Sequence, residues 1–218
     1  IDTWTNAANL HTGRGDHASS AMPNGDILVT GGYLSSVTNT TEAYDPDINA
    51  WTVKASLNVA RGGHEQISFT DAQGQSKVMV IGGTNLSQAL SSTEIYDPTT
   101  NSWSMGPSLH SARYDFSAVK LHDGRILVIG GDSGDNSEIY NPTTNNWTTY
   151  TPSYEFRRGA VVVLGEDENY KVFAAGGAPA ITNAMIFDPA TNVWTNTVEM
   201  LAPRYDFNLT LLQNGTVL

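Results

Sequence analysis

Hydrophobic residues along this chain fall into short runs, and each run ends in a pair of glycines. The four runs are Ile27-Leu28-Val29, Val78-Met79-Val80-Ile81, Ile126-Leu127-Val128-Ile129 and Val172-Phe173-Ala174-Ala175. They are rich in β-branched residues and bounded by turn residues, which predicts strands. Their apolar positions are consecutive rather than alternating, as is typical of a strand covered on both faces. No apolar stripe of helical period persists anywhere, so we expect an all-β protein.

Each run belongs to a larger unit that the chain repeats four times. An aromatic residue follows each glycine pair, a proline stands two residues later, and a tryptophan stands five residues after the proline. An asparagine lies two residues before each tryptophan, and an arginine lies ten residues after it. The aromatic residues are Tyr44, Tyr96, Tyr140 and Phe187, and the arginines are Arg14, Arg61, Arg113, Arg157 and Arg204. Self-similarity at a period of about 50 residues is typical of repeat architectures.

Every unit is predicted to hold four strands. The first follows the arginine, the second ends in Gly-Gly, the third carries the aromatic residue and the fourth carries the tryptophan. Between the third and fourth strands, Asp-Pro or Asn-Pro starts a turn, and the asparagine near its end tolerates the left-handed conformation. A small antiparallel sheet covered on both faces and repeated along the chain stacks radially, as propeller blades do. The glycines suit a close approach to a neighbouring blade, and the rings are expected to fill the space between blades.

These units resemble kelch repeats in their Gly-Gly pair, their spaced tryptophan and a Glu-x-Tyr motif at Glu42/Tyr44, Glu94/Tyr96 and Glu138/Tyr140. The fourth unit departs from the motif, since Met185 replaces the glutamate and Phe187 the tyrosine. The resemblance covers essentially the whole chain. It implies an all-β, kelch-type β-propeller of four-stranded antiparallel blades over residues 1–218, with complete blades near 14–54, 61–106, 113–150 and 157–197.

The two ends are predicted to belong to incomplete blades. Residues 1–5 match the end of a unit, and residues 204–218 match the start of one. Kelch propellers usually have six or seven blades, so we expect a fragment of a larger propeller. Alternatively, chains complete one another, because open blade edges would otherwise stay unpaired.

Composition narrows the classes of partner. The net charge of −11 disfavours nucleic acid, and no apolar run is long enough to insert into a membrane. The absence of cysteine excludes disulfides, thiolate metal sites and a cysteine nucleophile. No cofactor and no metal are predicted. Few lysines, abundant Asn, Ser and Thr, and no thiols favour an extracellular or cell-surface protein.

The favoured function is that of a non-catalytic binding or scaffold module that presents blade loops to a protein or a glycan. Loop length varies most at 33–43, 84–95, 132–139 and 178–186, and variable loops on one face of a repeat protein are its usual binding surface. The candidate partner-binding residues are Tyr33, Asp132, Asp135, Tyr150, Tyr154 and Arg158. Asn39, Asn85 and Asn214 are the glycosylation sequons expected in exposed loops.

The five arginines are expected to ring the mouth of the central channel, where they either bind an anionic or sugar ligand or hold neighbouring blades together. Their perfect periodicity favours the structural role. Asp16, Asp115 and Asp206 each follow an arginine by two residues.

Three further groups of residues have a functional and a structural interpretation, and the structural one is favoured in each case. His17 and His64 share one register and could ligate a metal, but inward packing is favoured. The oxygen-rich stretch Asp132–Glu138 could hold calcium, but an exposed polar loop is favoured. The stretch Tyr150–Arg158 could stack on a sugar or peptide, with blade packing as the alternative.

The alternative function is that of a kelch-type enzyme. Arg61-Gly62-Gly63 and Arg113-Tyr114 are similar to the galactose oxidase branch of kelch propellers. That resemblance implies a copper site with a cysteine-crosslinked tyrosine and paired histidines. This chain has no cysteine, and Asp115 and Asp206 stand where histidine would be needed. A sialic-acid mutarotase-like activity is a second enzymatic alternative, to which no residue is assigned.

Overall fold

The computed structural model describes residues 6–131, 136–151, 159–165 and 169–218. They form four separate four-stranded sheets, each antiparallel and each with its strands in chain order. Blade 1 holds β1 (Ala18–Ala21), β2 (Ile27–Thr30), β3 (Thr41–Asp45) and β4 (Ala50–Lys54); blade 2 holds β5 (Glu65–Thr70), β6 (Ser76–Ile81), β7 (Thr93–Asp97) and β8 (Ser102–Met105). Blade 3 holds β9 (Ser117–Lys120), β10 (Ile126–Ile129), β11 (Ser137–Asn141) and β12 (Asn146–Tyr150); blade 4 holds β13 (Ala160–Leu164), β14 (Lys171–Ala175), β15 (Ala184–Asp188) and β16 (Val193–Asn196).

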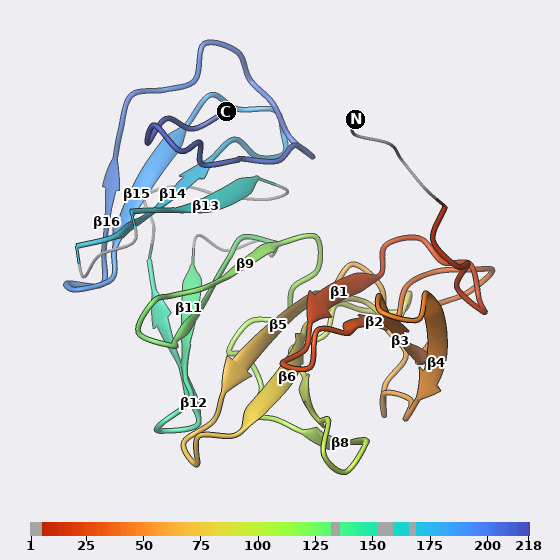
Figure 1. The fold of residues 1–218 in the computed structure, drawn as a ribbon. Helices are drawn as coiled ribbons and strands as arrows, with labels where there is room; N and C mark the ends of the chain where they lie inside the picture. Colours follow the sequence, from red (N-terminus) through yellow and green to blue (C-terminus); the bar gives the residue numbers. More distant parts are fainter. Residues whose placement is uncertain (1–5, 132–135, 152–158, 166–168) are drawn as a thin grey trace.

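The four blades follow one another around an arc (Figure 1). The first strand of each blade contacts the first strand of the next, in the pairs β1 with β5, β5 with β9 and β9 with β13. These first strands are therefore innermost, as the sequence predicts. The arrangement confirms an all-β propeller of four-stranded antiparallel blades.

The second strand of each blade is the core of its sheet. In β6 the residues from Val78 to Ile81 are at most 1% exposed, and so are those of β10 from Ile126 to Ile129. Consecutive burial requires cover on both faces, which the adjacent blades supply. The prediction drawn from the consecutive apolar runs is confirmed.

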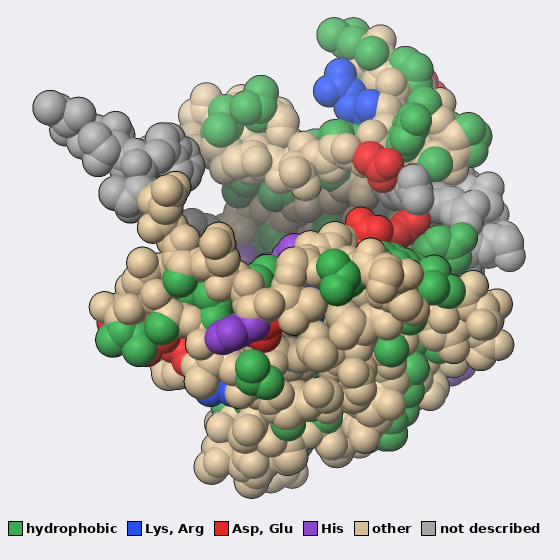
Figure 2. All heavy atoms as spheres, turned by 90° about the vertical axis from the view of Figure 1, so that its right-hand side faces the viewer, with side chains coloured by type: hydrophobic (Ala, Val, Ile, Leu, Met, Phe, Trp, Pro, Cys, Tyr) green, Lys and Arg blue, Asp and Glu red, His purple; other side chains and the backbone are tan. Residues whose placement is uncertain are grey.

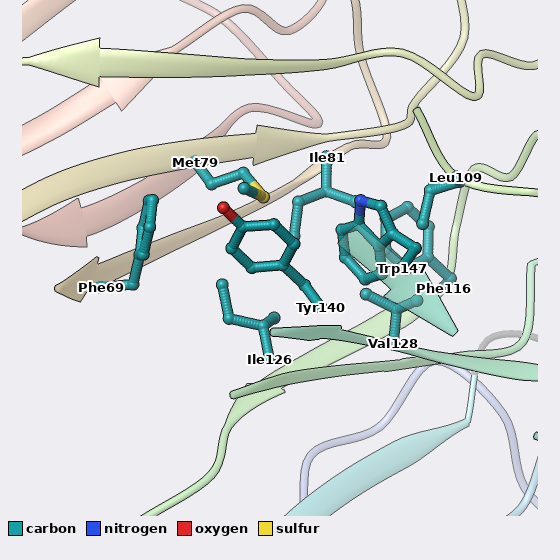
Figure 3. Close-up of a cluster of buried hydrophobic side chains, with 9 residues drawn as sticks. All are labelled: Phe69, Met79, Ile81, Leu109, Phe116, Ile126, Val128, Tyr140 and Trp147. Carbon is teal, nitrogen blue, oxygen red and sulfur yellow. The ribbon is translucent and has the colours of Figure 1, made fainter. Parts of the chain in front are cut away.

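Aromatic side chains fill the seams between blades, as predicted. Between blades 2 and 3, Tyr140 and Trp147 lie in one buried cluster with Phe69, Met79 and Ile81 (Figure 3). The indoles of blades 2, 3 and 4 also tie their blade to the preceding one. Trp103 Nε1 donates to Ala55 O at 2.9 Å, and Trp147 Nε1 donates to Pro107 O at 3.0 Å.

The glycine pairs lie where two blades meet. In blade 2, Gly82 and Gly83 both have positive φ, at 58° and 92°. The Gly83 N–H donates to Arg113 O of blade 3 at 2.8 Å. A Cβ on Gly82 would lie 2.6 Å from the same carbonyl oxygen. The glycines thus permit a backbone contact between blades that a side chain would block.

The structure describes only one of the two predicted partial blades. Residues 1–5 lie outside the described residues. Residues 210–218 form a short hairpin, in which Leu211 and Val217 pair and Thr210 N–H donates to Leu218 O at 2.9 Å.

Candidate functional site

A hollow with a volume of about 710 Å³ opens at the inner ends of the blades. Its lining comes from the segments just after the arginines and from the loops just after the glycine pairs, which share one end of the propeller. In Figure 2 a hollow separates two parts of the molecule, and acidic side chains lie at its edge. Its lining includes Asp16, Tyr33, Leu86, Tyr114 and Asp115.

A ring of backbone hydrogen bonds builds the rim of this hollow. Asp115 N–H donates to Gly63 O, and Gly63 N–H donates to Asp16 O, both at 3.0 Å. The three residues occupy the same position in successive blades, two after the arginine, and all have positive φ. Asp, Asn and Gly tolerate this conformation best, so the backbone explains why aspartate or glycine stands here. One consequence is that carboxylates are placed along the rim.

The arginines do not line the hollow. The side chains of Arg14, Arg61 and Arg113 are 0% exposed, and each pairs with the glutamate of its own blade. Arg61 Nη2 lies 2.9 Å from Glu94 Oε1, and Arg61 Nη1 donates to Gly82 O and Ser92 O. Burial lowers the pKa of Arg61 from its ordinary value, and the Glu94 charge partly opposes this shift. Of the expected channel-mouth residues, these three therefore lie inside the blades rather than at the mouth.

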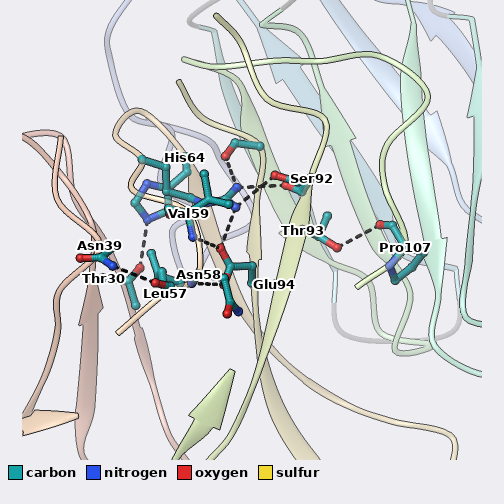
Figure 4. A network of polar contacts seen from close by, with 12 residues as sticks. Thr30, Asn39, Leu57, Asn58, Val59, His64, Ser92, Thr93, Glu94 and Pro107 are labelled. Atoms are coloured by element: carbon teal, nitrogen blue, oxygen red, sulfur yellow. Dashed lines mark hydrogen bonds and ion pairs between the residues drawn. The ribbon is translucent and has the colours of Figure 1, made fainter. Parts of the chain in front are cut away.

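Glu94 is held from several sides. It accepts the backbone N–H groups of Asn58 and Val59 at 2.7 and 3.0 Å, and the Asn58 side-chain amide at 2.9 Å (Figure 4). Glu42 is bound in the same way, by His11 and Thr12. Although burial would raise the pKa of Glu42, the hydrogen bonds from His11 and the charge of Arg14 hold it below its usual value. The Glu-x-Tyr glutamate thus joins the segment before the arginine to the third strand.

The buried ion pair seen for these three arginines is not described for the other two candidates, Arg157 and Arg204. Arg204 is exposed and its guanidinium lies 5.8 Å from the centre of the Phe207 ring. Arg157 lies outside the described residues, as do Asp132, Asp135, Tyr154 and Arg158.

Of the predicted partner-binding residues, Tyr33 lines the hollow. Tyr150 is half-buried and packs against the cluster of buried side chains between blades 3 and 4, so it is not part of an exposed platform. Asn214 is exposed, whereas Asn85 and Asn39 are half-buried. The Asn39 Nδ2, the atom a glycan would modify, donates to Leu57 O at 3.0 Å, which corrects the expectation that Asn39 is free in a loop.

His17 and His64 share a register but not an environment. His17 is exposed, whereas His64 is buried, and no group of three or more potential metal-ligating side chains occurs among the described residues. The Thr30 hydroxyl donates to Gln66 Oε1 at 2.6 Å, so His64 Nε2, 3.0 Å away, must donate to Thr30. Burial, together with the charges of Arg61 and His17, lowers the pKa of His64 to about 3. His64 is thus a neutral, structural residue of the seam between blades 1 and 2.

We expect His64→Phe to flatten the loss of stability in acid. Unfolding returns His64 to its ordinary pKa of 6.5, so its contribution to stability is complete above pH 6.5 and is lost as the pH falls towards 3. The loss amounts to at most about 1.4 kcal/mol per pH unit. Urea unfolding of both proteins between pH 7.5 and 5 measures it. Phe116 occupies the equivalent position of blade 3, so phenylalanine fits this register. Equal pH dependence in the two proteins would contradict a neutral His64.

A carboxylate that the sequence did not single out lies deeper along the inner strands. Glu65 lines a small cavity beside the hollow, together with residues of β9 and β13. Burial raises its pKa to about 8. Leu86, Tyr114 and Glu65 were all missed as candidates. A positional signal existed for Tyr114, which follows Arg113 directly. Leu86 lies in the variable loop 84–95, but nothing in the sequence distinguishes it from the other residues of that loop.

Comparisons with known proteins agree with this architecture. The family model of the kelch motif matches residues 14–58 and 68–110. Mouse Kelch-like protein 35 is 28% identical over 87% of this chain, and alpha-scruin of Limulus polyphemus is 32% identical over 60% of it. An F-box/kelch-repeat protein of Arabidopsis thaliana is 36% identical over 41% of the chain. The chain spans 32%, 14% and 23% of the lengths of these three relatives.

The solved structure of YjhT matches 97% of this chain at a TM-score of 0.76, with 18% sequence identity and 78% of that chain covered. At this identity the likeness concerns the fold. No helix among the described residues is long and apolar enough to cross a membrane. The repeated Gly-Gly, Glu-x-Tyr and Trp positions, the blades that they build and the family match lead to one assignment. The chain carries kelch repeats, and its fold is a kelch-type β-propeller.

Proposed function

We propose that this chain is a non-catalytic protein-binding module of a larger protein and that the hollow is its binding face. Kelch-repeat proteins typically serve as protein-binding scaffolds, which supports the first part. The second part is supported by the convergence of variable loops and inner segments from several blades on one hollow. The described lining contains no histidine, and the chain contains no cysteine, so nothing in it favours the copper-radical alternative.

The observation that carries this proposal is the conformation of Leu86. This leucine has a φ of 72° and is 59% exposed. A non-glycine residue in the left-handed region costs about 1–3 kcal/mol. The surrounding loop imposes the conformation, since Leu86 N–H donates to Thr84 Oγ1 and Asn85 Oδ1 accepts two backbone N–H groups. An exposed apolar side chain held at this cost does not serve the fold, and it favours a contact with a partner.

Aromatic and acidic groups surround Leu86 in the lining. Tyr33 and Tyr114 contribute rings, and Asp16 contributes a carboxylate. Burial and the charges of Asp16 and Asp115 raise the pKa of Tyr33, so its hydroxyl stays a hydrogen-bond donor at neutral pH. Tyrosine rings at the centre with polar groups around them are typical of a protein interface. We infer that the partner is a protein, which inserts apolar side chains between polar ones.

We expect Leu86→Asn to stabilise the fold and to weaken partner binding. Asparagine tolerates the left-handed region, so the free energy of unfolding should rise by up to about 1 kcal/mol. Loss of the apolar side chain should weaken binding about 10-fold or more. The larger protein serves as bait, and mass spectrometry compares the proteins captured by wild type and variant. Dissociation constants are then measured with each purified partner.

The matched control is Val53→Asn, which removes an apolar side chain that is 65% exposed on an outermost strand. It should leave binding unchanged. Partners lost with Val53→Asn and kept with Leu86→Asn would contradict the proposed face. Saturable binding of a glycan that Leu86→Asn abolishes would contradict the choice of a protein partner. The extracellular or cell-surface location expected from composition stays part of this proposal, and fractionation of the source cells tests it.

A further inference from the structure

A second cavity lies at the opposite end of the propeller from the hollow, in the seam between blades 2 and 3. It has a volume of about 290 Å³. Its walls are the turn between β5 and β6 and the turn between β11 and β12. We call it the seam cleft and use six of its lining residues: Phe69, Asp71, Lys77, Tyr140, Pro142 and Asn145.

The seam cleft exists because Asp71 stands where other blades have a large apolar residue. The turn between the first two strands has the same hydrogen bonding in blades 1 to 3, with Met22, Asp71 and Leu121 in its first position. Met22 and Leu121 are 7% and 1% exposed and belong to the buried clusters of their seams. The Asp71 carboxylate instead turns back and accepts the backbone N–H groups of Gln73 and Gln75 at 3.0 and 2.8 Å. The space beside Tyr140 is therefore left unfilled.

The seam between blades 3 and 4 shows that a guanidinium group fits the equivalent space. Between blades 3 and 4, Arg125 reaches from the same turn onto the following blade. Its Nη1 donates to Asn192 Oδ1 at 2.8 Å, and its Nη2 donates to Pro189 O at 2.7 Å. The residues equivalent to Asn192 and Pro189 in blade 3 are Asn145 and Pro142, and both line the seam cleft. The position of Arg125 is taken in blade 2 by Gln75, which brings no cation.

The charges of the seam cleft also favour a single cation. No ion pair of Asp71 occurs among the described residues. Burial raises the pKa of Tyr140, and the Asp71 charge adds to this shift. Lys77, the cation on the lining, is compensated by Asp97, whose Oδ2 lies 2.7 Å from its Nζ. Phe69 and Tyr140, which meet edge to face at 5.7 Å, line the inner side of the cleft.

We propose that the seam cleft binds a guanidinium group. The group would lie between the Asp71 carboxylate and the blade 3 turn, with its planar N–H pairs directed at Pro142 O and Asn145 Oδ1 as Arg125 directs them in the next seam. The amide oxygen of Asn145 accepts the Tyr140 hydroxyl and has a second acceptor position. An ammonium group lacks the planar fork that addresses two acceptors at once. The guanidinium comes either from an arginine side chain of a partner protein or from a free arginine-like compound.

Amide chemical shifts of the isotopically labelled chain test this proposal. The probes are agmatine, the tripeptide amide Gly-Arg-Gly and its lysine counterpart Gly-Lys-Gly. We expect saturable shifts confined to residues 69–77 and 140–146, with the arginine probes bound about 10-fold more tightly than the lysine probe. Tighter binding of the peptide than of agmatine assigns the site to a partner's arginine, and equal binding assigns it to a free compound. Equal shifts with the lysine probe, or none with any probe, would overturn the proposal.

Two variants distinguish binding in the seam cleft from non-specific attraction of a cation to an acidic protein. Asp71→Leu introduces the residue that fills the equivalent space in blade 3, so it should abolish binding while the chain stays folded. Asp71→Asn keeps the turn but removes the charge, and it should weaken binding about 5- to 10-fold. The control Asp47→Asn removes an exposed carboxylate of blade 1 and should change nothing. Retained binding in Asp71→Leu would rule out the seam cleft. Leu86→Asn should leave this binding intact, so a failure here is distinct from a failure of the proposed function.

Discussion

Replacing Arg61 with methionine is expected to lower the free energy of unfolding by about 3–5 kcal/mol. The variant leaves Glu94, which is 0% exposed, without its cation. A buried carboxylate without a partner must be desolvated or protonated, and both cost free energy. Because globular proteins are stable by only about 5–15 kcal/mol, a loss of this size should be visible as a large shift of the urea midpoint. Tryptophan fluorescence reports the transition, since the indoles lie in the seams.

A double variant separates the ion pair from the other contacts of Arg61. The fourth blade has Met185, fully buried, where Glu94 stands, so methionine is accommodated in this register. Arg61→Met combined with Glu94→Met should therefore be more stable than the sum of the two single losses, by about 1–3 kcal/mol. The control is Lys171→Met, because the Lys171–Asp188 pair is about one-third exposed and should contribute less than about 1 kcal/mol. Additive losses in the double variant would show that the pairing itself contributes little.

The position of the arginines shows where sequence reasoning reached its limit. Their register and periodicity predicted a shared structural role between neighbouring blades. The side chains of Arg14, Arg61 and Arg113 are instead buried, and each pairs with a glutamate of its own blade. Each arginine pairs with a glutamate at a different distance along the chain: 28, 33 and 25 residues for Arg14, Arg61 and Arg113. The loop between the second and third strands varies in length between the two partners. Because the number of residues between the arginine and the glutamate differs from blade to blade, sequence spacing does not reveal that they pair. The arginine and the glutamate each repeat visibly in the sequence.

The sequence predicted that aromatic side chains pack between the blades. It did not predict where this packing is interrupted. Tyr140 and Trp147 were expected between blades because large rings recur at one register, and they lie there. Asp71 breaks the pattern set by Met22 and Leu121, and a comparison of the turns alone would have revealed it. The presence of Asp71 leaves a cleft of about 290 Å³ between two blades. The size of this cleft depends on the packing of both blades, which the sequence does not show. The exposure of Leu86 likewise depends on a loop conformation that no local motif specifies.

The second large effect is expected for Gly82→Ala, which should lower the free energy of unfolding by about 2–5 kcal/mol. Gly82 has a φ of 58°, so any side chain is strained there. A Cβ would also lie 2.6 Å from Arg113 O and 3.1 Å from the Phe116 ring of the next blade. The carbonyl oxygen is fixed because it accepts the Gly83 N–H, so relief requires the two blades to separate. Thermal and urea unfolding measure the loss.

Gly124→Ala is the matched control that divides this loss into its two causes. Gly124 also has a positive φ, at 87°, but a Cβ there would meet no atom within 4 Å. It should therefore cost only the strain of the left-handed region, about 1–2 kcal/mol. The excess of Gly82→Ala over Gly124→Ala measures the contact between blades. If the two variants lose equal stability, the glycine pair serves the backbone of its own blade alone, and the close approach between blades is not what requires it.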